Sequence, residues 1–217
     1  MASHLDLEEQ EQLDQLKAFW RQYGNLITWA LIAALGTVAA WNGWNWWQRE
    51  QAISASGMYD ELERAGQAGD AVTAARIFED LKSRYPRTTY ARQGGLLVAK
   101  VQVDKGQAEP ARAALAWVAE QGGDAELRSL ARLRLAALLF EDKKYDEALK
   151  QLDAVDSPGF EALVADRRGD VLAAQGKPAD AISAYRSAWK GLEERLTYRR
   201  LVEAKLASLG ATTEATP

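Results

Sequence analysis

The pattern of apolar and polar residues divides the chain into a short polar start, one long apolar run and a helical remainder. No charged residue lies between Arg21 and Arg49, and the core of this run is apolar apart from two threonines. A helix needs about 20 apolar residues to cross the roughly 30 Å of bilayer hydrocarbon. Residues 25–47 supply that length, so the sequence predicts one transmembrane helix there.

Two other interpretations of the apolar run are weaker. The core helix of a soluble domain rarely stays uncharged over so many residues. A cleavable signal peptide has a basic start and a shorter apolar region, whereas the start of this chain is acidic. The residues VAA at 38–40 resemble a cleavage site, so the signal-peptide alternative stays open.

Aromatic residues flank the apolar run on both sides. Tryptophan and tyrosine concentrate at the two membrane–water interfaces, where an apolar ring and a polar N–H or O–H group are both accommodated. Trp20 and Trp44 are 24 positions apart, which is about 36 Å along a helix and close to the spacing of two interfacial belts. A ligand cage is less favoured, because the rings of the second cluster point in several directions around a helix. The expected membrane-interface residues are Trp20, Tyr23, Trp41, Trp44, Trp46 and Trp47.

Basic residues near the apolar run indicate its orientation. Lys17 and Arg21 precede it closely, whereas Arg49 alone follows it before Arg64. Because Lys and Arg accumulate on the cytoplasmic side of a membrane helix, we expect a cytoplasmic N-terminus and a large domain on the far side.

Past residue 50 a short helical motif recurs four times. Each copy has an alanine, a larger residue four positions later and an apolar residue three positions after that. The alanines are Ala74, Ala111, Ala148 and Ala181, spaced by 37, 37 and 33 residues. Spacings of four and seven trace one helix face, and a recurrence of about 34 residues is typical of helix pairs that stack into a solenoid.

These residues resemble the tetratricopeptide repeat. In that family a glycine at the turn between the two helices stands five positions before the alanine. Gly69, Gly106 and Gly176 match this position, and Lys143 departs from it in the third unit. Small residues are also required where the first helices make close contact, because a large side chain would push the helices apart. Ala99, Ala136 and Gly169 occupy these positions.

The expected fold is all-α, with a single N-terminal transmembrane helix followed by a tetratricopeptide-like α-solenoid of about four helix pairs. An amphipathic segment, 193–209, predicts a C-terminal capping helix. The expected organisation is an acidic N-terminal segment (1–24), the transmembrane helix (25–47), the repeat domain (48–209) and a disordered tail (210–217).

The resemblance also implies a binding surface. The concave face of such a repeat domain is lined by the first helix of each pair, and it usually binds an extended or helical peptide. Leu133 and Val103 could instead simply pack between helices, and Phe140 is the first residue to test. The matching groove positions are Leu96, Lys100, Val103, Leu133, Phe140 and Asp166.

Composition excludes several classes of function. The net charge is −4, of which the first 21 residues carry −3, so the body of the chain has no basic footprint for nucleic acid. There is no cysteine, and His4 is the only histidine. Disulfides, zinc thiolate sites, a cysteine nucleophile, a histidine-based triad and a multi-histidine metal site are therefore excluded within one chain.

One carboxylate pair could in principle perform acid–base chemistry. Asp166 and Asp170 lie four residues apart on one helix face. No nucleophile, metal-ligand set or phosphate-binding glycine loop accompanies them, and helix surfaces often carry such pairs. We therefore expect no catalytic site, no metal and no cofactor.

The opening stretch of the chain contains two distinctive motifs, FWRQYGN at 19–25 and WNGW at 41–44. Together with the anchor and the repeats, they make the whole chain resemble the YfgM family of ancillary subunits of the SecYEG translocon, and they are the most specific part of that resemblance. The resemblance implies a single-pass protein of the bacterial inner membrane with a periplasmic C-terminal domain. Its implied partners are SecYEG, a PpiD-type membrane-anchored periplasmic chaperone, exported client proteins and membrane lipid. The implied role is to help newly translocated proteins reach periplasmic chaperones.

Two further functions remain open on the sequence alone. The chain could be an envelope-assembly scaffold that presents proteins to another maturation complex. It could also be a regulator whose repeat domain lies in the cytoplasm, and mapping the membrane topology would exclude that possibility.

Overall fold

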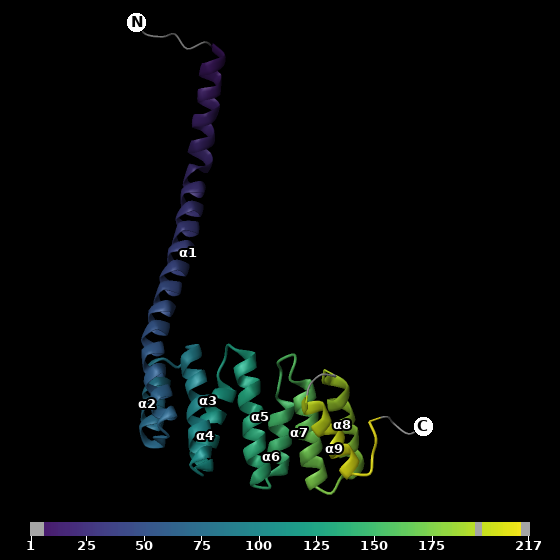
Figure 1. Ribbon diagram of the computed structural model, residues 1–217. Helices are drawn as coiled ribbons and strands as arrows, with labels where there is room; N and C mark the ends of the chain where they lie inside the picture. The colour runs from purple at the N-terminus through teal and green to yellow at the C-terminus, as the bar shows by residue number, and fades with distance from the viewer. Residues whose placement is uncertain (1–6, 194–196, 214–217) are drawn as a thin grey trace. The chain divides into compact units, whose positions relative to one another are not determined.

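The computed structural model describes residues 7–193 and 197–213, which form nine helices and no strand (Figure 1). The expected all-α fold is confirmed. Three parts of the predicted organisation lie outside the described residues: 1–6 of the acidic segment, 194–196 of the capping segment and 214–217 of the tail. The helices are α1 (Leu7–Gln67), α2 (Ala71–Arg84), α3 (Thr89–Asp104), α4 (Ala108–Glu120), α5 (Ala125–Glu141), α6 (Tyr145–Asp153), α7 (Glu161–Ala174), α8 (Pro178–Gly191) and α9 (Thr197–Ser208).

The chain divides into two compact units, and the boundary falls between Gln51 and Ala52. Helix α1 continues through this boundary without interruption. From the change in composition we predicted three segments in this stretch: the acidic segment, the transmembrane helix and the start of the repeat domain. The helix nevertheless continues, because no proline lies between Leu7 and Gln67 and the residues after Arg49 are mostly good helix formers.

Within the first unit, the apolar stretch of α1 is exposed on all sides. Leu26, Leu35 and Trp29 each leave more than 60% of their surface open. The hydroxyl groups of Thr28 and Thr37 donate to the carbonyls of Gly24 and Ala33 at 2.8 Å, so both threonine hydroxyls are satisfied within the helix. Such a surface is unfavourable in water and suits hydrocarbon. The helix is long and apolar enough to cross a membrane, and it fits a membrane anchor.

The second unit consists of helix pairs joined by one recurring turn. At the end of each first helix, a residue with positive φ lets two successive N–H groups bond back to the helix's last carbonyls, which is a Schellman motif. In the second pair, the N–H of Gly106 bonds the carbonyl of Val103 at 2.9 Å, and that of Gln107 bonds Gln102 at 2.8 Å. The residues at this position are Gly69 (φ 66°), Gly106 (φ 72°), Lys143 (φ 60°) and Gly176 (φ 73°).

Lys143 keeps the turn although it has a side chain. Its N–H bonds the carbonyl of Phe140 at 2.9 Å, as in the glycine turns. A non-glycine residue in the left-handed region costs roughly 1–2 kcal/mol. The third pair therefore contains local backbone strain that the other three pairs lack.

Replacing Lys143 with glycine is expected to stabilise the second unit by about 1 kcal/mol, because relief of this strain exceeds the extra chain entropy of an unfolded glycine. Chemical denaturation followed by circular dichroism would measure the change in unfolding free energy. Lys144→Gly is the matched control, since Lys144 has φ −84° and no strain to relieve. Equal stabilisation by both substitutions would contradict this explanation.

The last helix, α9, ends with the same turn as the first helices. The N–H of Gly210 (φ 71°) bonds the carbonyl of Ala207 at 2.9 Å, and that of Ala211 bonds Leu206 at 3.0 Å. Gly210 follows Gly176 by 34 residues, which continues the spacing of the earlier turns. Helix α9 is therefore the counterpart of a first helix, and it packs against α8.

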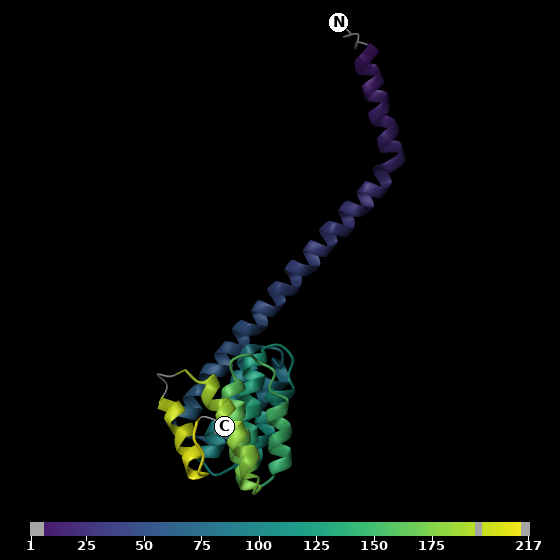
Figure 2. The same cartoon turned by 90° about the vertical axis from the view of Figure 1, so that its right-hand side faces the viewer.

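Helices α2 to α9 each pack against their neighbours in the chain, and the first helices α3, α5 and α7 also contact one another in sequence (Figure 1; Figure 2). The motif alanines Ala74, Ala111, Ala148 and Ala181 are fully buried. The larger residues four positions later, Phe78, Leu115, Leu152 and Tyr185, are at most 4% exposed. The pattern recognised in the sequence is thus the core of the second unit.

Candidate binding groove

Two neighbouring cavities open along the first helices of the second unit. One, of about 380 Å³, lies between α3 and α5, and the other, of about 160 Å³, lies between α5 and α7. Ala137 and Glu141 line both, so the two cavities form one depression that we call the groove. Its floor is largely apolar, with Val103, Leu138 and Phe140 among the lining side chains.

Three of the six predicted groove residues line this depression. Lys100 and Val103 lie in the larger cavity with exposed side chains. Phe140 lies in the smaller cavity, where its ring is 5.8 Å from that of Tyr145. Their role in binding stays a prediction, but each can be reached from solvent.

The other three predicted groove residues lie instead between helices. Leu96 is 7% exposed, Leu133 is 9% exposed and Asp166 is fully buried. The three residues occupy equivalent positions in α3, α5 and α7. At each position the first helix of the next pair packs over the residue. Their side chains are thus packed between successive helix pairs and covered from solvent.

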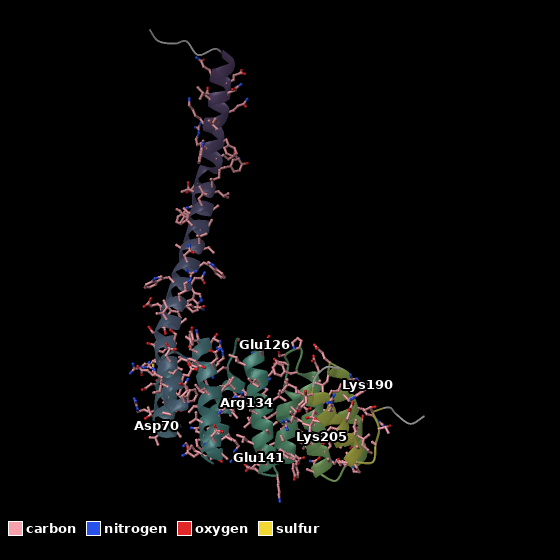
Figure 3. The ribbon with its side chains drawn as sticks, viewed as in Figure 1. Asp70, Glu126, Arg134, Glu141, Lys190 and Lys205 are labelled. Carbon is pink, nitrogen blue, oxygen red and sulfur yellow. The ribbon has the colours of Figure 1, made fainter. Side chains whose placement is uncertain are left out.

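Two charged groove residues were not predicted. Arg134 and Glu141 lie one turn on either side of Ala137 in α5 (Figure 3). Arg134 donates to the carbonyl of Leu96 at 3.2 Å, and Glu141 has an exposed carboxylate. Both could have been found from the repeat, because Ala137 stands six residues before Lys143 as Lys100 stands six before Gly106. Positions three and four residues away from Ala137 share its helix face.

The charges at the groove are of both signs. Lys100 pairs with Asp104 at 2.8 Å, and Arg167 pairs with Asp170 at 3.3 Å. An apolar floor with a rim of mixed charge suits a peptide segment that carries apolar side chains. Neither positive nor negative charge predominates at the groove, so it would not select a strongly charged ligand.

A buried polar cluster joins α7, α8 and α9. Lys205 of α9 lies 2.8 Å from Asp166 and 2.7 Å from Asp170. The hydroxyl of Tyr198 donates to Asp166 at 2.5 Å, and that of Tyr185 donates to Asp170 at 2.8 Å. We call Asp166, Asp170, Tyr185, Tyr198 and Lys205 the polar cluster.

The polar cluster explains why Asp166 is buried. At the equivalent positions of the preceding pairs, Leu96 and Leu133 make apolar packing. Asp166 replaces this packing with a carboxylate whose oxygens accept from a lysine and a tyrosine of α9. A buried carboxylate needs such partners, because an unpaired charge away from water is strongly destabilising. The Asp166 and Asp170 pair therefore serves to dock α9.

Burial raises the pKa of both tyrosines in the polar cluster, and the carboxylates that accept their hydrogen bonds raise it further. A raised pKa favours the neutral hydroxyl in the folded state. This contribution to stability is complete below the ordinary value of 10.0, and it is lost as the pH rises through the folded-state pKa.

The unfolding free energy of the second unit is accordingly expected to fall above about pH 10. Denaturation of the wild type and of Tyr198→Phe over a pH series would measure this. Tyr198→Phe should lose part of the pH dependence of the unfolding free energy, because one of the two tyrosine hydroxyls of the polar cluster is absent. An identical slope in both proteins would exclude Tyr198 as a source.

The predicted membrane-interface residues are all exposed in the first unit. Their exposed fractions run from 42% at Trp47 to 67% at Trp46. Trp44 and Trp47 contact each other with ring centroids 5.3 Å apart, whereas Trp46, two residues after Trp44, lies on another side of the helix. The structure describes Trp20, Tyr23, Trp41, Trp44, Trp46 and Trp47 as an exposed set around α1.

Within the described residues, no group of three or more histidine, cysteine, aspartate or glutamate side chains could hold a metal ion.

Comparison with known proteins shows the family. Residues 17–211 match the family described as a tetratricopeptide repeat-like domain. The chain is 32% identical to the ancillary SecYEG translocon subunit of Neisseria gonorrhoeae, over 96% of this chain and 100% of that protein. It is 33% identical to the protein of the same name from Escherichia coli, over 84% of this chain and 85% of that one. The Haemophilus influenzae protein of that name is 31% identical over 90% of this chain and 97% of its own length. With a tetratricopeptide repeat-like domain and relatives aligned along almost their full length, this chain belongs to the YfgM family of ancillary SecYEG translocon subunits.

Proposed function

We propose that this protein is a non-catalytic ancillary subunit of the SecYEG translocon. The observation that carries the proposal is the alignment with the translocon subunit of Neisseria gonorrhoeae over 96% of this chain, which includes the anchor as well as the repeats. The exposed apolar helix supports residence in the inner membrane. The open groove supports a role in holding other polypeptides.

Co-purification in mild detergent tests this role. The full-length protein should be recovered together with SecYEG subunits. A reproducible partner list without SecYEG would contradict the proposal and favour the envelope-assembly scaffold.

The repeat domain, 48–209, is proposed to lie in the periplasm and the acidic segment, 1–24, in the cytoplasm. The support is the position of Lys17 and Arg21 before the span, with Arg49 alone close behind it. Protease added to spheroplasts should digest the repeat domain. Protection of that domain would reverse the orientation.

The groove is proposed to bind a segment of an exported client protein or of a PpiD-type periplasmic chaperone. Its apolar floor and mixed rim suit an apolar peptide segment better than a highly charged one. A periplasmic position would place the groove where a client emerges from the translocon. The helper role follows from this arrangement, since a bound client could pass from the translocon to a chaperone.

Phe140→Ala is expected to weaken partner binding about tenfold while the domain stays folded, because aromatic side chains in apolar grooves often dominate binding. Quantitative pull-down of the identified partner, with circular dichroism as the folding check, would measure this. Val72→Ala is the control, since Val72 is 79% exposed and lies in α2 away from the groove. Unchanged binding by folded Phe140→Ala would remove Phe140 from the binding site.

A further inference from the structure

The part of α1 that precedes the apolar span has two chemically different faces. Leu13, Leu16, Phe19, Trp20 and Tyr23 recur every three or four residues, and each is between 41% and 54% exposed. This spacing places them on one side of the helix. The rings of Phe19 and Tyr23 lie 5.2 Å apart, so the apolar side is continuous at its membrane end. We call these five residues the apolar stripe.

The other side of the same helix is polar. Glu11, Asp14, Lys17 and Arg21 occupy it, and Lys17 pairs with Asp14 at 3.1 Å. Residues 5–14 contain five carboxylates and no cation. The helix therefore carries an exposed apolar stripe next to a strongly acidic end.

The lipid surface is a poor partner for the far end of the stripe. Leu13 lies seven residues before Trp20, which is about 10 Å further along the helix from the membrane interface. Helices that lie in the interface are rich in Lys and Arg on their polar face. A cytoplasmic leaflet with anionic lipids would instead repel these carboxylates.

A second copy of this chain is also a poor partner. Parallel association along the stripe would bring two identical acidic ends together, with five carboxylates in each. Like charges held close together oppose association. The partner that fits must be apolar along one face and basic beside it.

Cytoplasmic loops of polytopic membrane proteins have this chemistry, because Lys and Arg accumulate next to the cytoplasmic ends of their helices. We propose that residues 10–23 dock onto such a loop region, with the apolar stripe packed on the emerging helices and the carboxylates paired with loop cations. This inference rests on the proposed orientation with a cytoplasmic N-terminus. It adds a second contact to the proposed function, on the opposite side of the membrane from the groove.

Site-specific photocrosslinking of the full-length protein in intact cells tests the inference. A photoreactive residue at position 16 would report on the stripe, and one at position 18, which is exposed on the polar side, would report on the opposite side. We expect a protein adduct from position 16 and at least about fivefold less from position 18, because the stripe packs directly against the partner whereas the polar side meets it only through long basic side chains. Mass spectrometry should map the adduct to a Lys- or Arg-rich cytoplasmic loop of a polytopic membrane protein. A probe at position 20 shows that the reagent works.

A charge test accompanies the crosslinking. Glu11→Lys with Asp14→Lys should reduce the position-16 adduct about fivefold, since each lost ion pair weakens binding by a factor of a few. Glu61→Lys with Glu63→Lys makes the same change in net charge at exposed positions of the second unit and should leave the adduct unchanged.

Four results would overturn the inference: lipid adducts alone, adducts between two copies of this chain, equal adducts from positions 16 and 18, or an adduct that survives the charge reversal. Absence of a position-16 adduct while position 20 reacts would also overturn it. Co-purification with SecYEG is measured on the same cells. Its persistence under any of these results would leave the proposed function standing, whereas its loss from unsubstituted protein would reject that function separately.

Discussion

Lys205→Met is expected to lower the unfolding free energy of the second unit by about 3 kcal/mol, because removing one partner of a buried ion pair leaves the other charge without compensation. Asp166 is fully buried, and Lys205 contacts both of its oxygens at 2.8 and 2.9 Å. After the substitution, the Tyr198 hydroxyl is the one remaining described donor to this carboxylate. Release of α9 from α7 is the simplest way for Asp166 to regain water.

Hydrogen exchange of the full-length protein would detect this release. Amides of α9 should exchange roughly 100-fold faster if docking is weakened by about 3 kcal/mol. Amides of α3 should change little, because that helix does not contact α9. Lys190→Met is the matched control, since Lys190 is an exposed lysine of the adjacent helix α8 (Figure 3). A loss as large in the control as in Lys205→Met would show that the buried pair is not the cause.

A second variant tests whether Lys205→Met is destabilising because it leaves the Asp166 carboxylate without its partner. Asp166→Leu, Tyr198→Phe and Lys205→Met together would give α7 the leucine that α3 and α5 carry at the equivalent positions, 96 and 133. Replacing buried charges together with their partners by apolar residues of similar size is often neutral or stabilising, and Asp170 would keep Arg167 and Tyr185 as partners. The triple variant is therefore expected to be more stable than Lys205→Met alone. If it is less stable, the polar cluster contributes more than the compensation of one charge.

The burial of Asp166 is a feature that the sequence could not predict. The repeat pattern identified Leu96, Leu133 and Asp166 as equivalent positions, and this equivalence holds in the structure. The pattern could not show that all three are covered, because their cover comes from the next first helix. For Asp166 that cover is supplied by Tyr198 and Lys205, which lie 32 and 39 residues further along the chain. An aspartate where other units have leucine was the available signal that a buried partner was required.

Local features were more predictable than long-range ones. The turns at Gly69, Gly106 and Gly176 follow from single residues whose backbone tolerates positive φ. Lys143 keeps the turn because the packed helices on both sides determine its backbone. The groove could be predicted only in part. The predicted residues Lys100, Val103 and Phe140 line it, whereas Arg134 and Glu141 were not predicted. Which face of a first helix remains open depends on how its neighbours pack, and a repeat alignment does not contain that information.

Gly169→Val is expected to destabilise the second unit by about 3 kcal/mol, because overpacking a tightly filled contact forces side chains and backbone to move. A Cβ atom at Gly169 would lie 2.5 Å from two carbon atoms of the Tyr185 ring, far inside van der Waals contact. The ring cannot turn away without cost, since its hydroxyl donates to Asp170 at 2.8 Å. The substitution should therefore disturb the polar cluster as well as the contact between α7 and α8.

Chemical denaturation would measure this loss, and Gly57→Val provides its control. A Cβ at Gly57, in the part of α1 that belongs to the second unit, meets nothing within 4 Å. Valine there should be neutral or stabilise by a few tenths of a kcal/mol, because glycine is the poorer helix former. The second and third helix pairs combine a small and a medium-sized residue at this contact, with Ala99 and Leu115 lining one cavity and Ala136 and Leu152 lining the next. Gly169→Ala with Tyr185→Leu restores that combination and should be more stable than Gly169→Ala alone. If the double variant is no more stable, the close approach of Tyr185 is not what requires glycine at this position.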